Sequence, residues 1–260
     1  MKHHGTKKET SSGISILITG ASGGIGYATA IACAKRGARI GIHYHENRKR
    51  AEHLAGELDG AGHCLLQADI TDPDAAQNLG VQADNELGGL DVLVNNAGIA
   101  QRRQMDAISY QTWQATWKRV IDTNLTGPAN LSFCVAGLML ERGGGRMVNV
   151  SSRGAFRGEP RMPWYGASKA GMNAMGQSMA QALAPRDIFV FTVAPGFVET
   201  EMAREILASA EGESLRNQSS MGRVARPEEV ARTIEFLAFD APAFMTGCII
   251  DVNGASYLRS

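Results

Sequence analysis

A tyrosine and a lysine stand four residues apart in the segment Tyr165-Gly166-Ala167-Ser168-Lys169. The segment predicts the start of a helix, and residues at i and i+4 share one face of a helix. A phenol, with a reference pKa of about 10, is a poor acid or base near neutrality, but a neighbouring ammonium favours the phenolate and lowers that pKa. The pair therefore suits proton transfer to or from a small oxygen centre. A surface helix start would show the same spacing, so the motif needs support from the rest of the chain.

Short apolar runs alternate with helical patterns around this motif. The predicted strands cover residues 14–19, 39–44, 63–68, 90–95, 146–151, 188–194 and 248–252. The predicted helices cover residues 25–36, a charged stretch ending at 58, and residues 74–87, 109–141 and 165–183. Apolar strands that alternate with helices predict an α/β fold, a doubly wound Rossmann-type parallel sheet of about seven strands flanked by helices. We assign residues 13–260 to this single domain and residues 1–12 to a flexible polar tail.

Length, charge and cysteine usage exclude several classes of protein. The 260 residues fit one large α/β domain, and the 26 basic and 26 acidic residues cancel, which argues against a nucleic-acid partner. No stretch reaches the ~18 consecutive apolar residues that span a bilayer, and the N-terminus lacks an apolar signal core, so we expect a cytoplasmic protein without a membrane partner. The four scattered cysteines predict buried free thiols rather than disulfides or a metal site: Cys33, Cys64, Cys134 and Cys248.

A glycine-rich turn, TGASGGIG at residues 19–26, joins the first predicted strand to the first predicted helix. Gly20, Gly24 and Gly26 let the backbone turn tightly and approach a pyrophosphate, while the helix start offers free N–H groups and a favourable dipole. The spacing differs from GxGxxG, and a glycine-rich turn can be purely structural. Its position between a strand and a helix favours nucleotide binding, with Ser22 and Ile25 in the same turn.

The end of the second predicted strand bears on the choice between NAD and NADP. An acidic residue there would hold a ribose 2′-hydroxyl and favour NAD, but Tyr44 occupies that place. Arg48 and Lys49, with His45, are candidates to meet a 2′-phosphate. A solvated basic helix start would look the same, and Glu46 is close enough in sequence to reach the ribose. We expect NADP(H) to be favoured, with NAD(H) possible.

The chain resembles the short-chain dehydrogenase/reductase family over residues 15–257, which is nearly its whole length. The motifs that carry the resemblance are TGASGGIG at 19–26, Asp69-Ile70, Asn95-Asn96-Ala97-Gly98, Asn124, Ser152, Tyr165 with Lys169, Pro195-Gly196 with Thr200, and Asp251-Val252-Asn253-Gly254. Ser152 stands thirteen residues before Tyr165, the family's usual catalytic spacing. Ala255 departs from the pattern, since a second glycine is common there.

The resemblance implies a carbonyl–alcohol oxidoreductase in which hydride moves to or from a nicotinamide cofactor. Ser152 would orient the substrate oxygen, Tyr165 would pass the proton, and Lys169 would lower the tyrosine pKa and bind the nicotinamide ribose. Asn124 would hold a water that links Lys169 to solvent. The implied cofactor contacts are Gly20, Ser22, Gly24, Ile25, Gly26, Tyr44, His45, Asp69, Ile70, Asn96, Ala97, Gly98, Tyr165, Lys169, Pro195, Gly196, Val198 and Thr200. The alternatives are a strand-end hydroxyl for Ser152 and a backbone-bonding amide for Asn124.

The sequence specifies the substrate less closely than it specifies the reaction. The loop between Ser152 and Tyr165, which lines the pocket in the family, carries Arg153, Arg157 and Arg161. Two further arginines, at 102 and 103, follow the strand that ends in the NNAG motif. They suit an anionic or strongly polar substrate, or are simply exposed. Residues 199–222 resemble the family's substrate lid. The motif PGFVETEM looks like β-ketoacyl carrier-protein reductases, while sugar, polyol, steroid and other carbonyl substrates stay open.

Two further expectations concern assembly and class. The family commonly forms tetramers through two long helices, here about 109–141 and 165–183, so we expect a homotetramer arranged as a dimer of dimers. A helix buried within its own subunit would have the same apolar pattern. The alternative from another class is a non-catalytic nucleotide-sensing regulator with the same fold.

Overall fold

The computed structural model describes residues 13–259, and the predicted tail over residues 1–12 lies outside the described residues. Its centre is a seven-stranded, all-parallel sheet in the order β3-β2-β1-β4-β5-β6-β7. The strands are β1 Ser15–Ile18, β2 Arg39–Tyr44, β3 Cys64–Gln67, β4 Val92–Asn95, β5 Gly145–Val150, β6 Ile188–Pro195 and β7 Ile249–Val252. This confirms the doubly wound Rossmann-type prediction. The strand order reverses between β1 and β4, and ligands bind beyond the carboxyl ends of strands at such a point.

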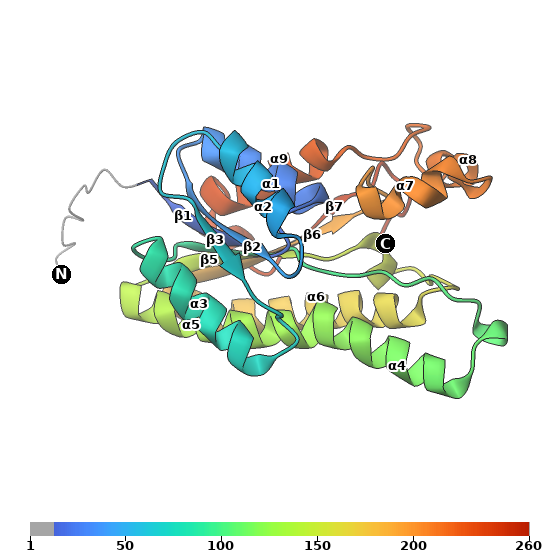
Figure 1. Cartoon of the computed structure of the whole chain (residues 1–260), viewed down its shortest axis with the longest axis horizontal. Helices are drawn as coiled ribbons and strands as arrows, with labels where there is room; N and C mark the ends of the chain where they lie inside the picture. Colours follow the sequence, from blue (N-terminus) through green and yellow to red (C-terminus); the bar gives the residue numbers. More distant parts are fainter. Residues whose placement is uncertain (1–12, 260) are drawn as a thin grey trace.

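Helices cover both faces of the sheet (Figure 1). One face carries α1 Gly24–Lys35, α2 Arg48–Glu57 and α9 Pro227–Phe239, and the other carries α3 Pro73–Glu86, α4 Tyr110–Ile121, α5 Gly127–Arg142 and α6 Pro163–Leu183. Each face has its own apolar core. In β1, Ile16 and Ile18 pack into the first core and Leu17 into the second, as the alternation of side chains along a strand requires.

The predicted helix over 109–141 is interrupted. After α4, residues Asp122–Thr126 form a π-helical turn before α5 begins. At Gly127 a Cβ would lie 2.5 Å from the Ile70 carbonyl oxygen, so only glycine allows the chain from β3 to pass this close. Extra residues in a turn of this kind are frequent at functional sites, and this one contains Asn124.

The helix α9 was not among the predicted elements, although its start carries a recognisable signal. Pro227 stands at its first position and two acidic residues follow in its first turn. Its buried face, which includes Val230, Ile234 and Leu237, packs against α1 and completes the first core. A helix over 227–239 was therefore readable from the sequence and was missed.

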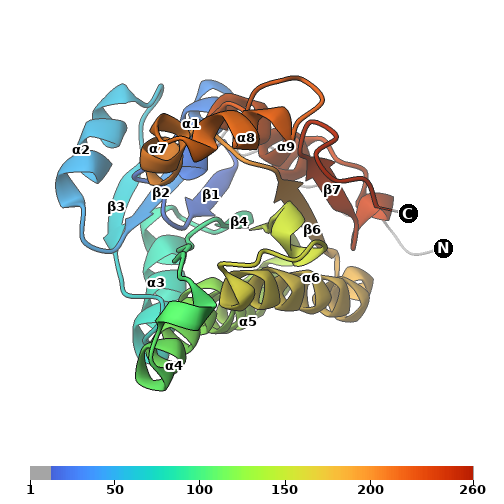
Figure 2. The same ribbon diagram turned by 90° about the vertical axis from the view of Figure 1, so that its right-hand side faces the viewer.

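The predicted lid contains two short helices, α7 Glu201–Ala208 and α8 Glu211–Asn217. They lie beyond the end of the sheet, above α4 and α6 in the view of Figure 2. Ala203, Leu207 and Leu215 form a small core of their own, separate from the two large ones. The two helices thus have an apolar cluster that is separate from the cores on the two faces of the sheet.

The structure bears on two expectations that the composition raised, one about the cysteines and one about membrane spans. All four cysteines are free, but only Cys33 is buried, while Cys64, Cys134 and Cys248 are partly exposed. The prediction of buried thiols was therefore wrong for three of them. Among the described helices, none combines the length and apolar character that a bilayer crossing needs.

Candidate active site

A cavity of about 900 Å³ opens along the carboxyl ends of the central strands. Most of the predicted site residues line it: Gly20, Ser22, Gly24, Ile25, His45, Asp69, Ile70, Asn96, Ala97, Gly98, Ser152, Tyr165, Lys169, Pro195, Gly196, Val198 and Thr200. Three predicted residues do not line it: Gly26, Tyr44 and Asn124. The structure therefore brings the glycine turn, the tyrosine–lysine pair and the segment after β6 to one cavity.

The glycine turn fits the pyrophosphate of a dinucleotide. Gly20 has a left-handed backbone with φ of +62°, and a Cβ at Gly26 would lie 2.5 Å from Asn96 Nδ2. Gly26 thus serves close packing beneath the turn rather than ligand contact. No side chain caps the start of α1 at Gly23, so the first N–H groups of the helix are open to an anion.

The turn is held by the segment after β4. Thr19 Oγ1 accepts hydrogen bonds from the backbone N–H groups of Asn96 at 2.9 Å and Ala97 at 3.0 Å. Asn96 Nδ2 donates in return to the Thr19 carbonyl at 2.8 Å. These contacts fix the two segments that flank the cavity at the point where the strand order reverses.

His43 is a cavity residue that the sequence interpretation missed. Its ring is 2 % exposed, and its Nδ1 accepts a hydrogen bond from Gly20 N–H at 3.0 Å. The proton therefore sits on Nε2, which lies 3.1 Å from the Ala68 carbonyl oxygen and donates to it. Burial lowers the pKa of His43 to about 4, so the ring is neutral near pH 7. His43 ties the glycine turn to the end of β3.

The neighbouring residue Tyr44 does not reach the cavity, contrary to its assignment as a cofactor contact. Side chains alternate along β2, so Tyr44 points to the opposite face from His43 and is buried in the first core. His45 does line the cavity, and its Nε2 lies 3.7 Å from an Asp69 carboxylate oxygen. The missed signal was the alternation itself, which puts residues 43 and 45 on the same face.

The basic start of α2 is arranged differently from the prediction. Arg48 Nε is bound to Glu52 at 2.8 Å, and neither Arg48 nor Lys49 lines the cavity. Arg50 instead reaches the glycine turn, where its Nη2 would be 3.6 Å from a Cβ at Gly23. It also forms an ion pair with Glu201 at the start of the lid.

Ser152 and Tyr165 meet at the opposite end of the cavity. The Ser152 hydroxyl accepts from Gly154 N–H at 3.0 Å and lies beside the ring of Tyr165. A Cβ at Gly154 would lie 3.2 Å from Glu159 Cγ, 3.3 Å from Ser152 Oγ and 3.5 Å from Tyr165 Cε1. Glu159, which sequence reasoning did not single out, therefore sits beside the serine–tyrosine pair and lines the same cavity.

Electrostatics at Tyr165 differ from the expectation that Lys169 lowers its pKa. Burial raises the pKa of Tyr165, the Ser152 hydrogen bond opposes the rise, and the Glu159 charge adds to it. Lys169 Nζ lies 5.9 Å from the centre of the tyrosine ring and donates to the Val150 carbonyl at 2.7 Å. Burial lowers the pKa of Lys169 to about 8, so its proton is weakly held near neutrality.

Asn124 holds the backbone in this structure. Its Oδ1 accepts from Ile99 N–H at 2.8 Å, and its Nδ2 donates to the Ile99 carbonyl at 2.9 Å and to Ser168 Oγ at 3.1 Å. Gly98 separates it from Lys169, because a Cβ at Gly98 would be 3.2 Å from Asn124 Oδ1 and 3.5 Å from Lys169 Nζ. Of the two predicted roles, the structure displays the backbone-bonding amide.

The arginines near the cavity share acceptors, since Arg153 and Arg157 both donate to Gln218 Oε1. Arg161 and Arg102 both bind Glu211 of α8, at 2.8 Å and 2.9 Å. Arg157 Nε lies 3.8 Å from Glu159. Arg153 is 3 % exposed, lines the cavity and donates to Gln218 Oε1 at 2.5 Å. The expected common field of loop arginines is thus divided between a lid contact and one buried cation.

Comparisons with known proteins agree with this geometry. Residues 20–255 match the family described as enoyl-(acyl carrier protein) reductase. The chain is 38 % identical over 244 residues to the 3-oxoacyl-[acyl-carrier-protein] reductase FabG of Thermotoga maritima, covering 92 % of this chain and 95 % of that protein. It is 36 % identical over 241 residues to an acetoacetyl-CoA reductase of Rhizobium meliloti, covering 93 % and 97 %.

A solved structure resembles the whole fold. A short-chain type dehydrogenase/reductase from Mycobacterium marinum superposes with a TM-score of 0.83 at 31 % identity, covering 94 % of this chain and 96 % of that one. The seven-stranded parallel sheet, the matched family and these relatives lead to one conclusion. The chain belongs to the short-chain dehydrogenase/reductase family and is an oxidoreductase related to 3-oxoacyl-thioester reductases.

Proposed function

We propose that this protein interconverts a carbonyl and a secondary alcohol with a nicotinamide cofactor, and that Tyr165 is the acid/base. The observation that carries the proposal is that Ser152 and Tyr165 lie side by side in the cavity that the glycine turn also lines. A hydroxyl pair at the end of a dinucleotide-sized cavity suits a substrate oxygen that exchanges a proton while hydride is exchanged at its carbon.

Each residue has a separate task in this mechanism. The nicotinamide cofactor, when bound, supplies or accepts the hydride. Ser152 donates a hydrogen bond to the substrate oxygen and orients it, and Tyr165 gives its phenolic proton to that oxygen during reduction. Lys169, fully buried with a pKa of about 8, replaces the proton that the tyrosine has lost. Asn124 is proposed as the fourth member, positioning the backbone at Ile99 beside Lys169.

The cofactor residues follow from the same cavity. Gly20, Ser22 and Gly24 would hold the pyrophosphate, Asp69 and Ile70 the adenine, and the segment after β6, with Pro195, Gly196, Val198 and Thr200, the nicotinamide. Thr200 lies against the turn, since its Cγ2 would be 3.0 Å from a Cβ at Gly24. The lid therefore begins at the glycine turn itself.

We propose NADP(H) as the preferred cofactor. Arg50 beside Gly23 supplies positive charge where a 2′-phosphate would lie, and His45 in the cavity wall offers a ring nitrogen to the same group. Glu46 also lines the cavity and favours the ribose hydroxyl of NAD(H). Initial rates with NADPH and with NADH on one carbonyl substrate test this cofactor preference. Equal or better rates with NADH would contradict the proposal.

The substrate class proposed from the relatives is a 3-oxo compound. The names of two relatives specify reduction of 3-oxoacyl and acetoacetyl thioesters. A panel of 3-oxo thioesters, 3-oxo acids, sugars and steroid ketones, read by NADPH absorbance, would test this class against the others.

Replacement of Tyr165 by Phe tests the catalytic assignment. The variant keeps the ring but loses the proton, so turnover should fall by at least about a hundredfold while cofactor binding persists. Turnover is read by NADPH absorbance and binding by calorimetry, with Tyr110→Phe on the exposed face of α4 as the matched control. Retained turnover in Tyr165→Phe would refute the mechanism. Tight cofactor binding by the wild type without turnover of any panel member would favour the nucleotide-sensing regulator.

A further inference from the structure

Arg153 is a buried cation without a carboxylate partner. Arg153 is 3 % exposed. Among the side chains that the structure describes in residues 13–259, no carboxylate oxygen lies within 4.0 Å of its guanidinium. Its one protein acceptor in that part of the chain is the neutral amide oxygen of Gln218, at 2.5 Å from Nη2. Removing a guanidinium from water is costly unless an opposite charge compensates it.

The guanidinium is held in place but leaves one edge open. Its carbon lies 5.2 Å from the centre of the Phe197 ring, a distance at which the ring face attracts a cation. Nη2 donates one of its two N–H groups to Gln218, whereas Nε and Nη1 have no acceptor among the described residues. The second N–H of Nη2 and the N–H that lies parallel to it, on Nε or on Nη1, form the planar fork that binds a carboxylate through two hydrogen bonds.

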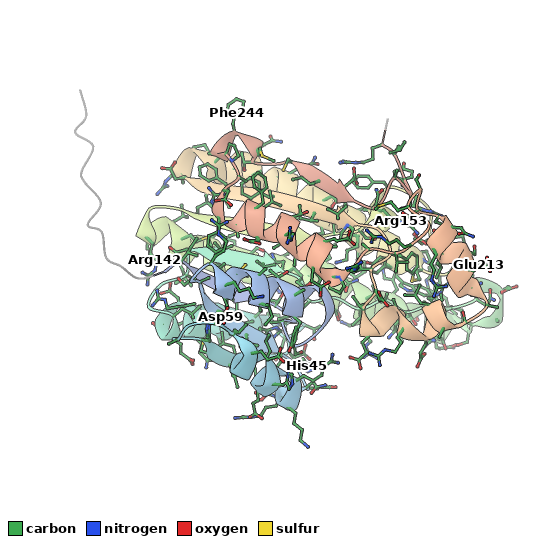
Figure 3. All side chains as sticks on the ribbon, turned by 90° about the horizontal axis from the view of Figure 1, so that it is seen from above. His45, Asp59, Arg142, Arg153, Glu213 and Phe244 are labelled. Carbon is green, nitrogen blue, oxygen red and sulfur yellow. The ribbon has the colours of Figure 1, made fainter. Side chains whose placement is uncertain are left out.

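Arg153 also lies where a substrate must pass. It lines the large cavity together with Ser152 and Tyr165, and it lines a second cavity of about 180 Å³ under the lid. Figure 3 labels Arg153 within the body of the molecule, beside the lid segment, whereas Glu213 lies at the periphery. The other arginines nearby have partners, since Arg161 and Arg102 bind Glu211 and Arg157 contacts Glu159 and Gln218.

The surrounding charges favour a monoanion. Glu159 lines the same cavity, and its charge acts on both Arg153 and Tyr165. A doubly charged phosphate would meet one open cation and a nearby carboxylate, whereas a carboxylate needs only the single fork. Arg157 adds positive charge beside Arg153, but it is partly exposed and lies 3.8 Å from Glu159.

We propose that Arg153 binds a free carboxylate on the substrate, so that this enzyme reduces oxo acids, or oxidises hydroxy acids, rather than neutral thioesters. The inference rests on the proposed carbonyl reduction and names the substrate class of that same site. Specificity of this kind follows when a buried charge is left unpaired by the wrong substrate.

The first test compares matched substrates on the wild-type protein. With NADPH, kcat/KM is measured for acetoacetate and for its methyl ester, and for a longer 3-oxo acid and its ester. We expect the acid to be preferred by at least about tenfold, because only the acid neutralises the buried guanidinium. Equal or better turnover of the esters overturns the carboxylate proposal but leaves the oxidoreductase intact. Failure of every carbonyl compound overturns the proposed function itself.

The second test uses Arg153→Met, which keeps much of the side-chain volume without the charge. The variant should lose at least about thirtyfold in kcat/KM for the acid and no more than about threefold for the ester. Arg157→Met, from the same loop, is the matched control and should keep the wild-type preference. Arg153→Lys should recover part of the acid activity, because a charge returns without the fork.

A binding measurement keeps the inference testable if Arg153→Met is poorly active on both substrates. 3-Hydroxybutyrate should raise the melting temperature of the wild type and of Arg157→Met, but not that of Arg153→Met. A purely structural role, holding Gln218 and the lid, would instead lower acid and ester activity equally and leave the hydroxy-acid shift present. That pattern would overturn the proposal.

Discussion

At the scale of single residues, the site depends on groups kept neutral by burial. His43 is the clearest case, because its Nδ1 must remain unprotonated to accept the Gly20 N–H. Burial lowers its pKa from 6.5 to about 4. Between these values the unfolded chain binds more protons than the folded one, so the free energy of unfolding falls as the pH drops from 6.5 towards 4.

We predict that His43→Asn removes this pH dependence. An amide oxygen still accepts from Gly20 but does not titrate, so the variant should lose less stability over that interval, by on the order of 3 kcal/mol. Urea unfolding at several pH values measures the free energy of unfolding of both proteins. In the difference between them, the contribution of the carboxylates that both proteins share cancels. The exposed His53→Asn is the control, and an unchanged slope in His43→Asn would contradict the assignment.

Glu159 provides a second prediction at this scale. Burial raises the pKa of Tyr165, and the Glu159 charge raises it further. The variant Glu159→Gln should therefore shift the pH profile of alcohol oxidation, which requires the phenolate, towards lower pH. The profile of kcat/KM against pH measures the shift, with Glu141→Gln at the exposed end of α5 as control. A profile that stays in place would show that the carboxylate does not act on the phenol.

At the scale of elements, the sequence predicted more of the fold than of the site. Strands and helices were readable because continuous apolar runs and turn residues mark them in a doubly wound sheet. In β2 every residue from Ile40 to Tyr44 is buried, so burial does not distinguish the two faces of the strand, and the alternation that puts residues 43 and 45 on one face was the signal that was missed. Tyr44 was therefore assigned to the cavity and His43 overlooked. The partners of the loop arginines depend on where α8 docks, which no local pattern specifies.

Glu211 ties the proposed lid to two loops, and this gives a prediction for the element. Glu211 opens α8 and receives Arg102 at 2.9 Å and Arg161 at 2.8 Å, from loops after β4 and before α6. Glu211→Gln should increase hydrogen exchange over residues 201–217 several-fold and raise KM, because the lid opens more often. The melting temperature should hardly change, because exposed ion pairs contribute little.

The matched control for the lid is Glu213→Gln, an exposed residue on the same helix. It removes an equal charge two positions away without touching either arginine. If the amides of residues 201–217 exchange at the same rate in Glu211→Gln and in Glu213→Gln, Arg102 and Arg161 do not hold the lid.

At the scale of the whole molecule, the surface of α4 and α5 exposes three large aromatic side chains. Phe133 on α5 is 79 % exposed, and Tyr110 and Trp117 on α4 are 70 % and 37 % exposed. Trp117 stacks on Trp113 at 5.6 Å, so the aromatic surface is preformed. Exposed aromatic anchors of this kind mark protein–protein interfaces. We propose that this surface joins subunits in the expected homotetramer.

Phe133→Glu should break that assembly. A buried carboxylate on each side of a symmetric contact would be unpaired and would repel its copy, so the tetramer should dissociate to dimers. Light scattering at several protein concentrations measures the mass, and Phe244→Glu, a fully exposed position between α9 and β7, tests whether any added charge has the same effect. A tetramer that survives Phe133→Glu would assign the interface to another face. A monomeric wild type would refute the assembly altogether, since the exposed aromatic side chains would then have no partner in a second copy of this chain.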